Sequence, residues 1–594
     1  MLSFGKRPRE LSWFHAGPML FGDWGTSRLY VLGLAFAASG YGSFVYIAAM
    51  GALLLVVAWA YTVICRAYPD GGGVYAAARE RAPVLGVIGG LLLFADYVVT
   101  ASLSALEAFH YLGVGNPAIW AVVSLALLGV VHYFGPKKAG VLALWIAAAA
   151  FGAYLVVGAF TLPHAVHAEV RAPSASVGGH WKHFVHVVLA LSGVEAVANM
   201  TGIMVAPVSK TSRRTIWPVA IEVVVINLLL ALGMNALPIP EAELRLHDED
   251  MLRVIAEHYV GPGFASIASV AFALLLLSAS STAITGMLGI QFSMARDGEI
   301  PRGIGRLNRF GVPQWALVAS ALAPILVLVF VSDLQGLAAL YAIGVVGAIA
   351  INCYATARSK SPEVGPRARI GLGLIAALMV AIWITTGVEK PQALVFAGCI
   401  LAVGLAARFG LRAYRERVHP VQKVPFPAGA PVILVASRGD TWIVDQGYQR
   451  ASEIGAAVVV CLVREASFLI GVGESPQPDP ALDPEATALF EYARRAAQDR
   501  NLPMRTFYDI STQPMAVVVD VAATMGVAEL HVGGSRRSRL EKVLRGSPLS
   551  EIEALLPEGI ELVVHDIHAP RHDPDVHGHP APEPPAVGGA DDSK

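Results

Sequence analysis

Charged residues are scarce in this 594-residue chain, which is 55% hydrophobic and only 15% charged. Soluble globular proteins carry roughly 25% charged residues, so the deficit indicates a membrane protein. The 44 basic and 45 acidic residues give a formal net charge of -1. Because no overall basic field is present to attract a polyanion, we do not expect binding to nucleic acid.

Cysteine is also scarce, and no two cysteines form a CxxC pair; the four are Cys65, Cys353, Cys399 and Cys461. This spacing fits neither a disulfide framework nor a zinc module. The sequence therefore argues against redox and metal-thiolate chemistry.

Long apolar runs are abundant up to about residue 410, whereas the remainder has the composition of a soluble domain. A membrane span needs about 20 mostly apolar residues. Twelve segments qualify, near residues 15–38, 43–65, 83–110, 116–134, 139–161, 181–205, 216–237, 263–290, 312–331, 334–355, 368–387 and 391–409. Basic residues gather in alternate loops and the other loops hold the acidic stretch 241–257, so we expect both termini in the cytoplasm. The charged N-terminus and its long first apolar run argue against a cleaved signal peptide.

Polar side chains form a stripe in the third span. Asp96, Tyr97, Thr100 and Ser104 recur at helical spacing, so a carboxylate, a phenol and two hydroxyls face one path. The hydroxyl of Thr100 or of Ser104, taken alone, is more simply explained by a hydrogen bond to the backbone carbonyl four residues earlier. The carboxylate near mid-membrane favours a functional path, because a charge in hydrocarbon is costly.

Glycine and hydroxyl residues interrupt two spans that lie five spans apart. The first span contains Gly22-Asp23-Trp24-Gly25-Thr26-Ser27-Arg28-Leu29-Tyr30, and the sixth contains Ser192-Gly193-Val194-Glu195. Breaks at matching positions are typical of transporters built from inverted five-span repeats, whose binding site lies at the breaks. Close packing at glycine is the alternative, but it accounts for neither Asp23 nor Glu195.

The chemistry of these residues favours a cation as the ligand. Every candidate ligand is an oxygen, and Asp23 and Asp96 stay ionised most easily with an alkali cation between them. An amino acid would bring a carboxylate that Asp23 repels. Glu195 has no basic neighbour in its segment, which suits a residue that takes up and releases a proton.

Arg28 either pairs with an acid or obstructs the path, and a paired or snorkelling side chain is the simpler interpretation.

These motifs resemble a known superfamily. The loops Tyr68-Pro69-Asp70-Gly71-Gly72-Gly73-Val74-Tyr75 and Ala295-Arg296-Asp297-Gly298-Glu299-Ile300-Pro301 look like cytoplasmic loops of the amino acid–polyamine–organocation superfamily. The nonapeptide at 22–30 resembles the Gly-Asp-x-Gly-Thr-Ser-Pro-Leu-Tyr motif of the Kup potassium transporters, with Arg28 in place of proline. The membrane half as a whole is most similar to the KimA branch of that family. The resemblance implies a LeuT-like 5+5 inverted repeat and proton-coupled potassium symport by alternating access.

The resemblance also implies which residues form the site. Potassium would be held by the residues that match the family's ligands, namely Asp23, Tyr30, Asp96, Tyr97, Thr100, Ser104, Ser192 and Tyr341. Glu195 would match the proton-coupling residue. Without the resemblance, an isolated tyrosine such as Tyr341 more often packs in the core or anchors at the interface.

The C-terminal part alternates strand-like and helical patterns. Strands are expected at 432–436, 457–463, 504–508, 530–532 and 560–565, and helices at 441–454, 484–499 and 514–525. This alternation predicts a parallel, doubly wound α/β sheet. It resembles the universal stress protein fold.

A degenerate phosphate loop accompanies that resemblance and leaves two interpretations open. Its candidate nucleotide-binding residues are Gly534, Arg536, Arg537, Gly546 and Ser547. Glycine amides and arginines can hold phosphates, and the resemblances imply cyclic di-AMP or ATP as the regulatory ligand. The other interpretation is a solvated basic loop on a sheet that makes only dimer contacts.

The sequence as a whole predicts a twelve-helix transporter domain at 1–410, a connector at 411–431, a cytosolic α/β domain at 432–567 and a disordered tail at 568–594. We expect a multi-pass protein of the cell membrane, surrounded by lipid and homodimeric, that is not an enzyme and has no catalytic residues. Its ligands would be K+ and H+, without a resident cofactor. Two alternatives stay open: an amino-acid or amine permease of the same superfamily, and a nutrient sensor that binds without transporting.

Overall fold

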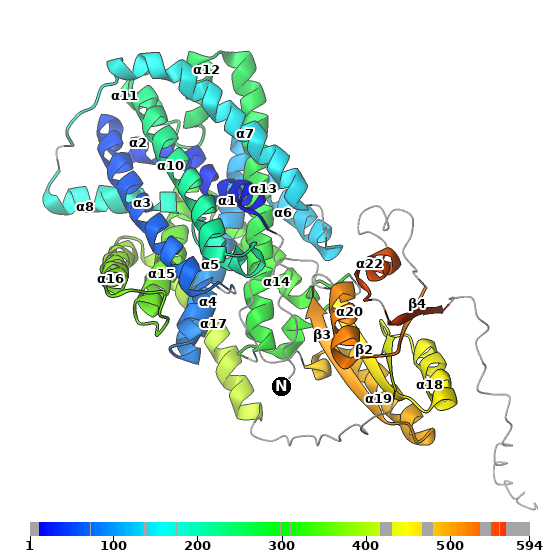
Figure 1. Ribbon diagram of the computed structural model, residues 1–594. Helices are drawn as coiled ribbons and strands as arrows, with labels where there is room; N and C mark the ends of the chain where they lie inside the picture. Colours follow the sequence, from blue (N-terminus) through cyan, green and yellow to red (C-terminus); the bar gives the residue numbers. More distant parts are fainter. Residues whose placement is uncertain are drawn as a thin grey trace, which may run out of the picture.

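The computed structural model shows a long helical part followed by a smaller α/β part (Figure 1). It describes residues 11–69, 71, 73–135, 139–173, 175–191, 193–297, 299–308, 310–415, 431–465, 479–511, 514–534, 548–557 and 559–565. Ser192, residues 416–430 of the expected connector and the expected tail at 568–594 lie outside the described residues.

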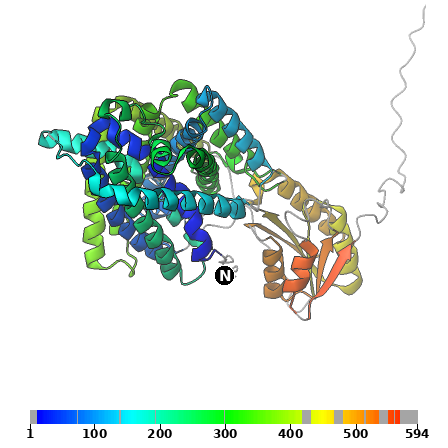
Figure 2. The same ribbon diagram turned by 90° about the horizontal axis from the view of Figure 1, so that it is seen from above.

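The helical part follows the expected spans closely. Its helices are α1 (Trp13–Trp24), α2 (Arg28–Ser39), α3 (Ser43–Ala67), α4 (Gly73–Arg79), α5 (Pro83–Tyr111), α6 (Pro117–Tyr133), α7 (Ala139–Thr161), α8 (Val177–His186), α9 (Ala196–Met200), α10 (Val208–Asn235), α11 (Glu241–Leu244), α12 (Met251–Tyr259), α13 (Pro262–Arg296), α14 (Gln314–Phe330), α15 (Leu334–Ala357), α16 (Pro366–Glu389) and α17 (Pro391–Arg415). Short 3-10 turns are η1 (Gly25–Ser27), η2 (Gly40–Gly42), η3 (Leu162–His167), η4 (Val188–Leu191), η5 (Thr201–Ile203) and η6 (Arg302–Gly305). Figure 2 shows these helices gathered in one bundle.

Several of these helices have the length and hydropathy of membrane spans. In the described parts of the chain, eight helical segments meet both criteria, or nine when the bent pair of α8 and η4–α9 is counted as one span. This is the pattern of a multi-pass membrane protein. The number twelve stays a prediction, because α6 and α14 are apolar but only 17 residues long and one of the eight segments, Trp13–Ala67, runs through two expected spans.

Both expected interruptions appear in the backbone. The first span consists of α1 and α2 joined by η1, where the Thr26 hydroxyl donates to the carbonyl of Asp23 at 2.6 Å and the Ser27 hydroxyl to that of Trp24 at 2.9 Å. The two hydroxyls therefore donate to backbone carbonyls at the end of α1, where the α-helical pattern is interrupted. In the sixth span, η4 and a turn at residues 193–195 separate α8 from α9, with Gly193 at φ +90°.

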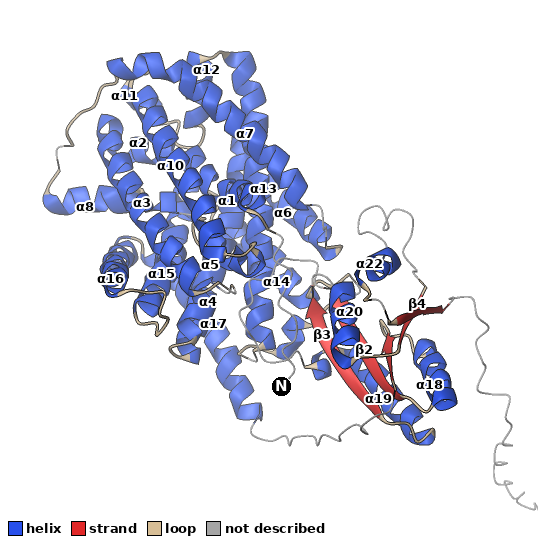
Figure 3. Ribbon diagram, viewed as in Figure 1, coloured by secondary structure: helices blue, strands red, loops and turns tan. Residues whose placement is uncertain are grey.

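The α/β part is a parallel, doubly wound sheet, as predicted (Figure 3). Its strands are β1 (Val432–Ala436), β2 (Ala457–Glu465), β3 (Met504–Ser511), β4 (Glu529–Gly533) and β5 (Glu561–His565), in the order β3-β2-β1-β4-β5. Its helices are α18 (Trp442–Ile454), α19 (Pro484–Asp499), α20 (Pro514–Met525) and α22 (Pro548–Leu555), with a short turn η7 (Pro480–Leu482) before α19. Helices α18 and α19 bury one apolar face of the sheet, and α20 and α22 bury the other. Strands with two buried faces are the reason for the unbroken Val- and Ile-rich runs in the sequence.

Candidate functional site

The two interrupted spans meet at Gly193 and Asp23. A Cβ atom on Gly193 would lie 2.8 Å from the carbonyl carbon of Asp23 and 2.9 Å from the backbone nitrogen of Trp24. Only glycine leaves room for this contact, and its φ of +90° is also one that other residues rarely adopt. The turn before α9 is thus held against the end of α1, and the two breaks form one site.

Asp23 projects from this meeting point toward α13. The hydroxyl of Thr282, on α13, donates a hydrogen bond to Oδ1 of Asp23. The Asp23 side chain is partly exposed. Helix α13 therefore supplies a third wall of the site.

Asp96, Glu195 and Tyr341 lie together beside Asp23. All three side chains are at most 4% exposed. The Asp96 carboxyl interacts with Glu195 and Tyr341 and, through space, with Asp23. Glu195 in turn interacts with both Asp23 and Asp96. Three carboxyl groups from α1, α5 and the turn before α9 thus converge in the interior of the bundle.

The convergence is tight because α15 and α5 touch through their backbones. A Cβ on Gly344 would stand 2.7 Å from the amide nitrogen of Asp96. One turn earlier on α15, Tyr341 faces the Asp96 carboxyl.

No Lys or Arg within the described residues forms a salt bridge with Asp23, Asp96 or Glu195. Neither oxygen of Asp96 accepts a hydrogen bond of ordinary geometry from a described residue. The site therefore carries acidic groups that no described basic side chain neutralises.

Tyr97 belongs to the same cluster. Its ring packs against Gly286 of α13, and its hydroxyl accepts a hydrogen bond of 2.9 Å from the amide of Asn199 on α9. The side chain also interacts electrostatically with Glu195, Asp96 and Asp23. Tyr97 links α5 to α9 at the edge of the carboxyl cluster.

The remaining expected ligands are less closely connected to the carboxyls. The Thr100 hydroxyl donates to the carbonyl of Asp96 at 2.9 Å, which is the simple i−4 bond expected for a hydroxyl alone. Ser104 is buried one turn further along α5. Tyr30 is 2% exposed and interacts with Tyr154 of α7.

Arg28 is paired with Glu222 and forms no salt bridge with Asp23. Its guanidinium donates to both carboxylate oxygens of Glu222 on α10, each at 2.8 Å. It also stacks over the ring of Tyr154, 4.3 Å from the centroid. Of the two interpretations of Arg28, the paired side chain is confirmed, and its charge is directed to α7 and α10.

Two residues of the site were not among the sequence candidates. Thr282 follows a run of hydroxyl residues, Ser278, Ser280 and Ser281, within an otherwise apolar span, and that run was the available signal. Asn199 follows the Ser192-Gly193-Val194-Glu195 interruption by four residues, on α9, but nothing in the sequence indicates its partner.

The loops at 68–75 and 295–301 also meet. The Tyr75 hydroxyl and the Arg79 guanidinium both donate to Oδ2 of Asp297, at 2.8 Å and 2.6 Å. Residues from both loop motifs thus form one polar contact at the end of α13.

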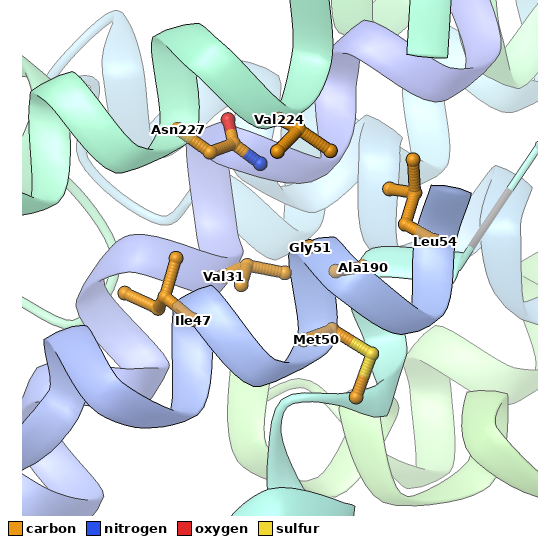
Figure 4. A pocket seen from close by; sticks show the side chains of 8 residues that line it. All are labelled: Val31, Ile47, Met50, Gly51, Leu54, Ala190, Val224 and Asn227. Atoms are coloured by element: carbon orange, nitrogen blue, oxygen red, sulfur yellow. The ribbon is translucent and has the colours of Figure 1, made fainter. Parts of the chain in front are cut away.

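A hollow elsewhere in the bundle is not part of this site. It lies between α2, α3, η4 and α10 and is lined by Val31, Ile47, Met50, Gly51, Leu54, Ala190, Val224 and Asn227 (Figure 4). Asn227 is the only polar side chain in this lining. The hollow is therefore lined mainly by apolar side chains and contributes no carboxylate.

Only one residue of the expected phosphate loop is described. Gly534 follows β4, and its amide donates to the carbonyl of His565 at 2.9 Å. That amide is used within the sheet and is not available to a phosphate. Arg536, Arg537, Gly546 and Ser547 lie outside the described residues.

Comparison with known proteins gives similarity over most of the chain. Residues 11–404 match the family model described as "Amino acid permease". The potassium transporter KimA of Bacillus subtilis is 24% identical over 468 residues, covering 73% of this chain and 76% of that protein. A probable potassium transport system protein Kup of Xanthomonas oryzae is 33% identical over 187 residues, covering 25% of this chain and 29% of that protein.

Two further similarities complete the comparison. A probable Kup protein of Cutibacterium acnes is 27% identical over 386 residues, covering 55% of each chain. A solved universal stress protein in complex with cAMP is 15% identical; the match covers 23% of this chain and 97% of that one, with a TM-score of 0.18.

Proposed function

Because this chain belongs to the amino acid permease family, we propose that its helical part transports potassium into the cell, with the carboxyl cluster at the two helix breaks as the ion site. The observation that carries the proposal is the convergence of Asp23, Asp96 and Glu195 in the bundle interior without a basic partner among the described residues.

The physical argument is electrostatic. Two unit charges 4 Å apart repel by about 4 kcal/mol at an effective dielectric constant of about 20, so three neighbouring carboxylates, two of them buried, cannot all be ionised at low cost. A cation bound among them, a proton on one of them, or both, removes the repulsion. K+ is a hard cation that takes several oxygen ligands in place of its water shell, and the site offers carboxylate and phenol oxygens. The potassium transporters among the relatives support the choice of K+ over other cations.

The ligand set proposed for K+ is the one expected from the sequence, with Thr282 added. It comprises Asp23, Tyr30, Asp96, Tyr97, Thr100, Ser104, Ser192, Tyr341 and Thr282. Five of these, Asp23, Asp96, Tyr97, Tyr341 and Thr282, have contacts within the cluster that support the assignment.

Glu195 is proposed as the residue that couples uptake to protons. Its carboxyl interacts directly with that of Asp96, so a proton on one of the two relieves their repulsion. Replacement of Glu195 by Gln should leave an uptake activity that no longer responds to a proton gradient. Full dependence on the gradient in Glu195→Gln would exclude this role.

We also propose the finer architecture that the sequence predicts. It consists of twelve spans in a 5+5 inverted repeat over residues 1–410, a connector at 411–431, a cytosolic domain at 432–567 and a tail at 568–594. The protein would lie in the plasma or inner membrane, with both termini in the cytoplasm. The cytosolic domain is proposed to pair two chains and to bind a regulatory nucleotide, cyclic di-AMP or ATP. Isothermal titration of the full-length protein tests the last point, and no heat with either nucleotide would leave only the pairing role.

The experiment for the main proposal is rescue of a potassium-uptake-deficient host at low external K+. We expect the wild type to restore growth, and Asp23→Asn and Asp96→Asn to fail at equal surface expression. Absence of rescue by the wild type, despite expression, would contradict potassium transport.

The description of the family model favours a second candidate, an amino-acid or amine permease. An organic amine is also a cation and would suit the same carboxyls, whereas an amino acid would place its carboxylate beside Asp23. Competition separates the candidates: excess amino acid or diamine should leave K+ uptake unchanged if K+ is the substrate. Net K+ uptake also excludes a sensor that binds without transporting.

A further inference from the structure

A buried carboxylate that the proposed ion site does not use lies further along α5. Glu107 is 0% exposed, and neither of its oxygens accepts a hydrogen bond from a described residue. It follows Asp96 by 11 residues, which is about 16 Å along a helix and returns to within about 20° of the same face. Glu107 therefore extends the stripe of Asp96, Thr100 and Ser104 toward the far end of α5.

Other acidic groups face Glu107 from the loop between α11 and α12. Glu107 interacts through space with Glu249, Asp248 and Asp250 of that loop. Nδ1 of His110 lies 3.6 Å from Oε1 of Glu107 and 2.9 Å from Oε2 of Glu249. Since 3.6 Å is too long for a hydrogen bond, His110 contacts Glu249 more closely and does not satisfy Glu107.

The loop is fixed over this end of the bundle by three contacts. The carbonyl of Asp248 lies against Gly33 of α2, where a Cβ would collide with it. Gln335, at the start of α15, donates to Oδ2 of Asp248 at 3.1 Å. The Arg245 guanidinium donates to the carbonyl of Ala37 at 2.6 Å. Helices α11 and α12 lie together at the top of Figure 1, on the side that the distribution of basic residues assigns to the exterior.

We propose that Glu107, together with Glu249, forms a second alkali-cation site at the outer end of the path, which takes K+ before it passes to Asp96. The identity of the cation rests on the proposed function. A buried carboxylate without a hydrogen-bond partner, with only the His110 ring 3.6 Å from it, is costly unless a cation or a proton accompanies it. The Glu249 side chain is 44% exposed while that of Glu107 is 0% exposed, so the pair connects the aqueous loop to the buried stripe. Ser104 and Thr100 provide hydroxyl oxygens between Glu107 and Asp96.

Initial uptake rates in proteoliposomes of the full-length protein test this site. Glu107→Gln keeps the size of the side chain and removes its charge, so we expect the KM for external K+ to rise roughly tenfold while the maximal rate changes less than about twofold. Glu243→Gln is the matched control, because Glu243 is an exposed acid of the same external segment. An unchanged KM in Glu107→Gln, or a loss of maximal rate together with a lower melting temperature, would overturn the outer site.

A binding measurement separates this proposal from the proposed function. In full-length Asp96→Asn, KCl should raise the melting temperature relative to choline chloride, and addition of Glu107→Gln should remove that difference. No KCl effect in Asp96→Asn, or an equal effect with and without Glu107→Gln, would contradict a second site. Failure of the wild type to transport K+ would contradict the proposed function alone, since the thermal measurement needs no transport.

Discussion

Gly193 and Asp23 touch through their backbones, so that the break in the sixth span rests on the break in the first. A Cβ at Gly193 would stand 2.8 Å from the carbonyl carbon of Asp23 and 2.9 Å from its Cβ. Backbone atoms cannot move aside for an added methyl group, whereas the end of a flexible side chain can. The position of the Asp23 carboxyl therefore depends on the absence of a side chain at residue 193.

Gly193→Ala should abolish uptake. The added methyl group collides with Asp23, and alanine is strained at φ +90°. K+ uptake and surface expression are the measurements. Gly17→Ala on α1 is the matched control, because a Cβ there meets nothing within 4 Å, and it should retain uptake. Equal activity in the two variants would contradict the contact.

Thr282→Val should weaken the site without preventing folding. Valine has nearly the shape of threonine but cannot donate to Asp23, so one oxygen of that carboxylate loses its partner. We expect the KM for K+ to rise several-fold, on the order of tenfold for a lost hydrogen bond to a charged group. Thr282→Ser keeps the hydroxyl and should restore most of the affinity. A normal KM in Thr282→Val would remove Thr282 from the site.

Arg28→Ala should lower stability far more than removal of both partners together. Arg28 is 0% exposed and Glu222 is 16% exposed, so loss of Arg28 leaves a largely buried, unpaired carboxylate. Breaking a buried pair typically costs about 3–5 kcal/mol, whereas apolar replacement of both partners is often neutral. Melting temperatures of Arg28→Ala, Glu222→Gln and the double variant Arg28→Met/Glu222→Leu test this. If Arg28→Ala is no less stable than the double variant, the pair is not structural.

The α/β part should lose stability as the pH falls below about 6.5. Burial, and secondarily the neighbouring His531, lower the pKa of His565 from its usual value. The unfolded chain then binds a proton at a pH where the folded chain does not, so the free energy of unfolding decreases as the pH drops through that range. Scanning calorimetry of the full-length protein between about pH 8 and pH 5.5 should show this decrease, and His565→Gln should reduce it. The same slope in His565→Gln would show that another group is responsible.

Local sequence patterns predicted the elements well and their contacts less well. The strands at 432–436 and 457–463 and the helix at 484–499 were predictable because apolar periodicity is a local signal, and they occur nearly as expected. The two helix breaks were predictable for the same reason, since glycine and hydroxyl residues mark them in the sequence.

Pairings between distant residues could not be predicted. Arg28 and Glu222 are 194 positions apart, and Asp23 and Thr282 are 259 apart, so no local pattern connects them. Glu107 is visible in the sequence as a charge within an expected span. Its burial among other acidic groups depends on the loop at 245–250, which folds over it. The Thr100 hydroxyl shows the opposite case: its bond to the Asp96 carbonyl is local, and the sequence identified that possibility.

The most direct test of the account is K+ uptake by the purified protein in proteoliposomes with wild-type, Asp23→Asn and Asp96→Asn chains at equal reconstituted amounts. If the carboxyl cluster at the helix breaks is the ion site, the wild type accumulates K+ from low external concentration, and each Asn variant loses that accumulation while keeping a folded, monodisperse profile. Accumulation by both variants at the wild-type rate would contradict the central claim.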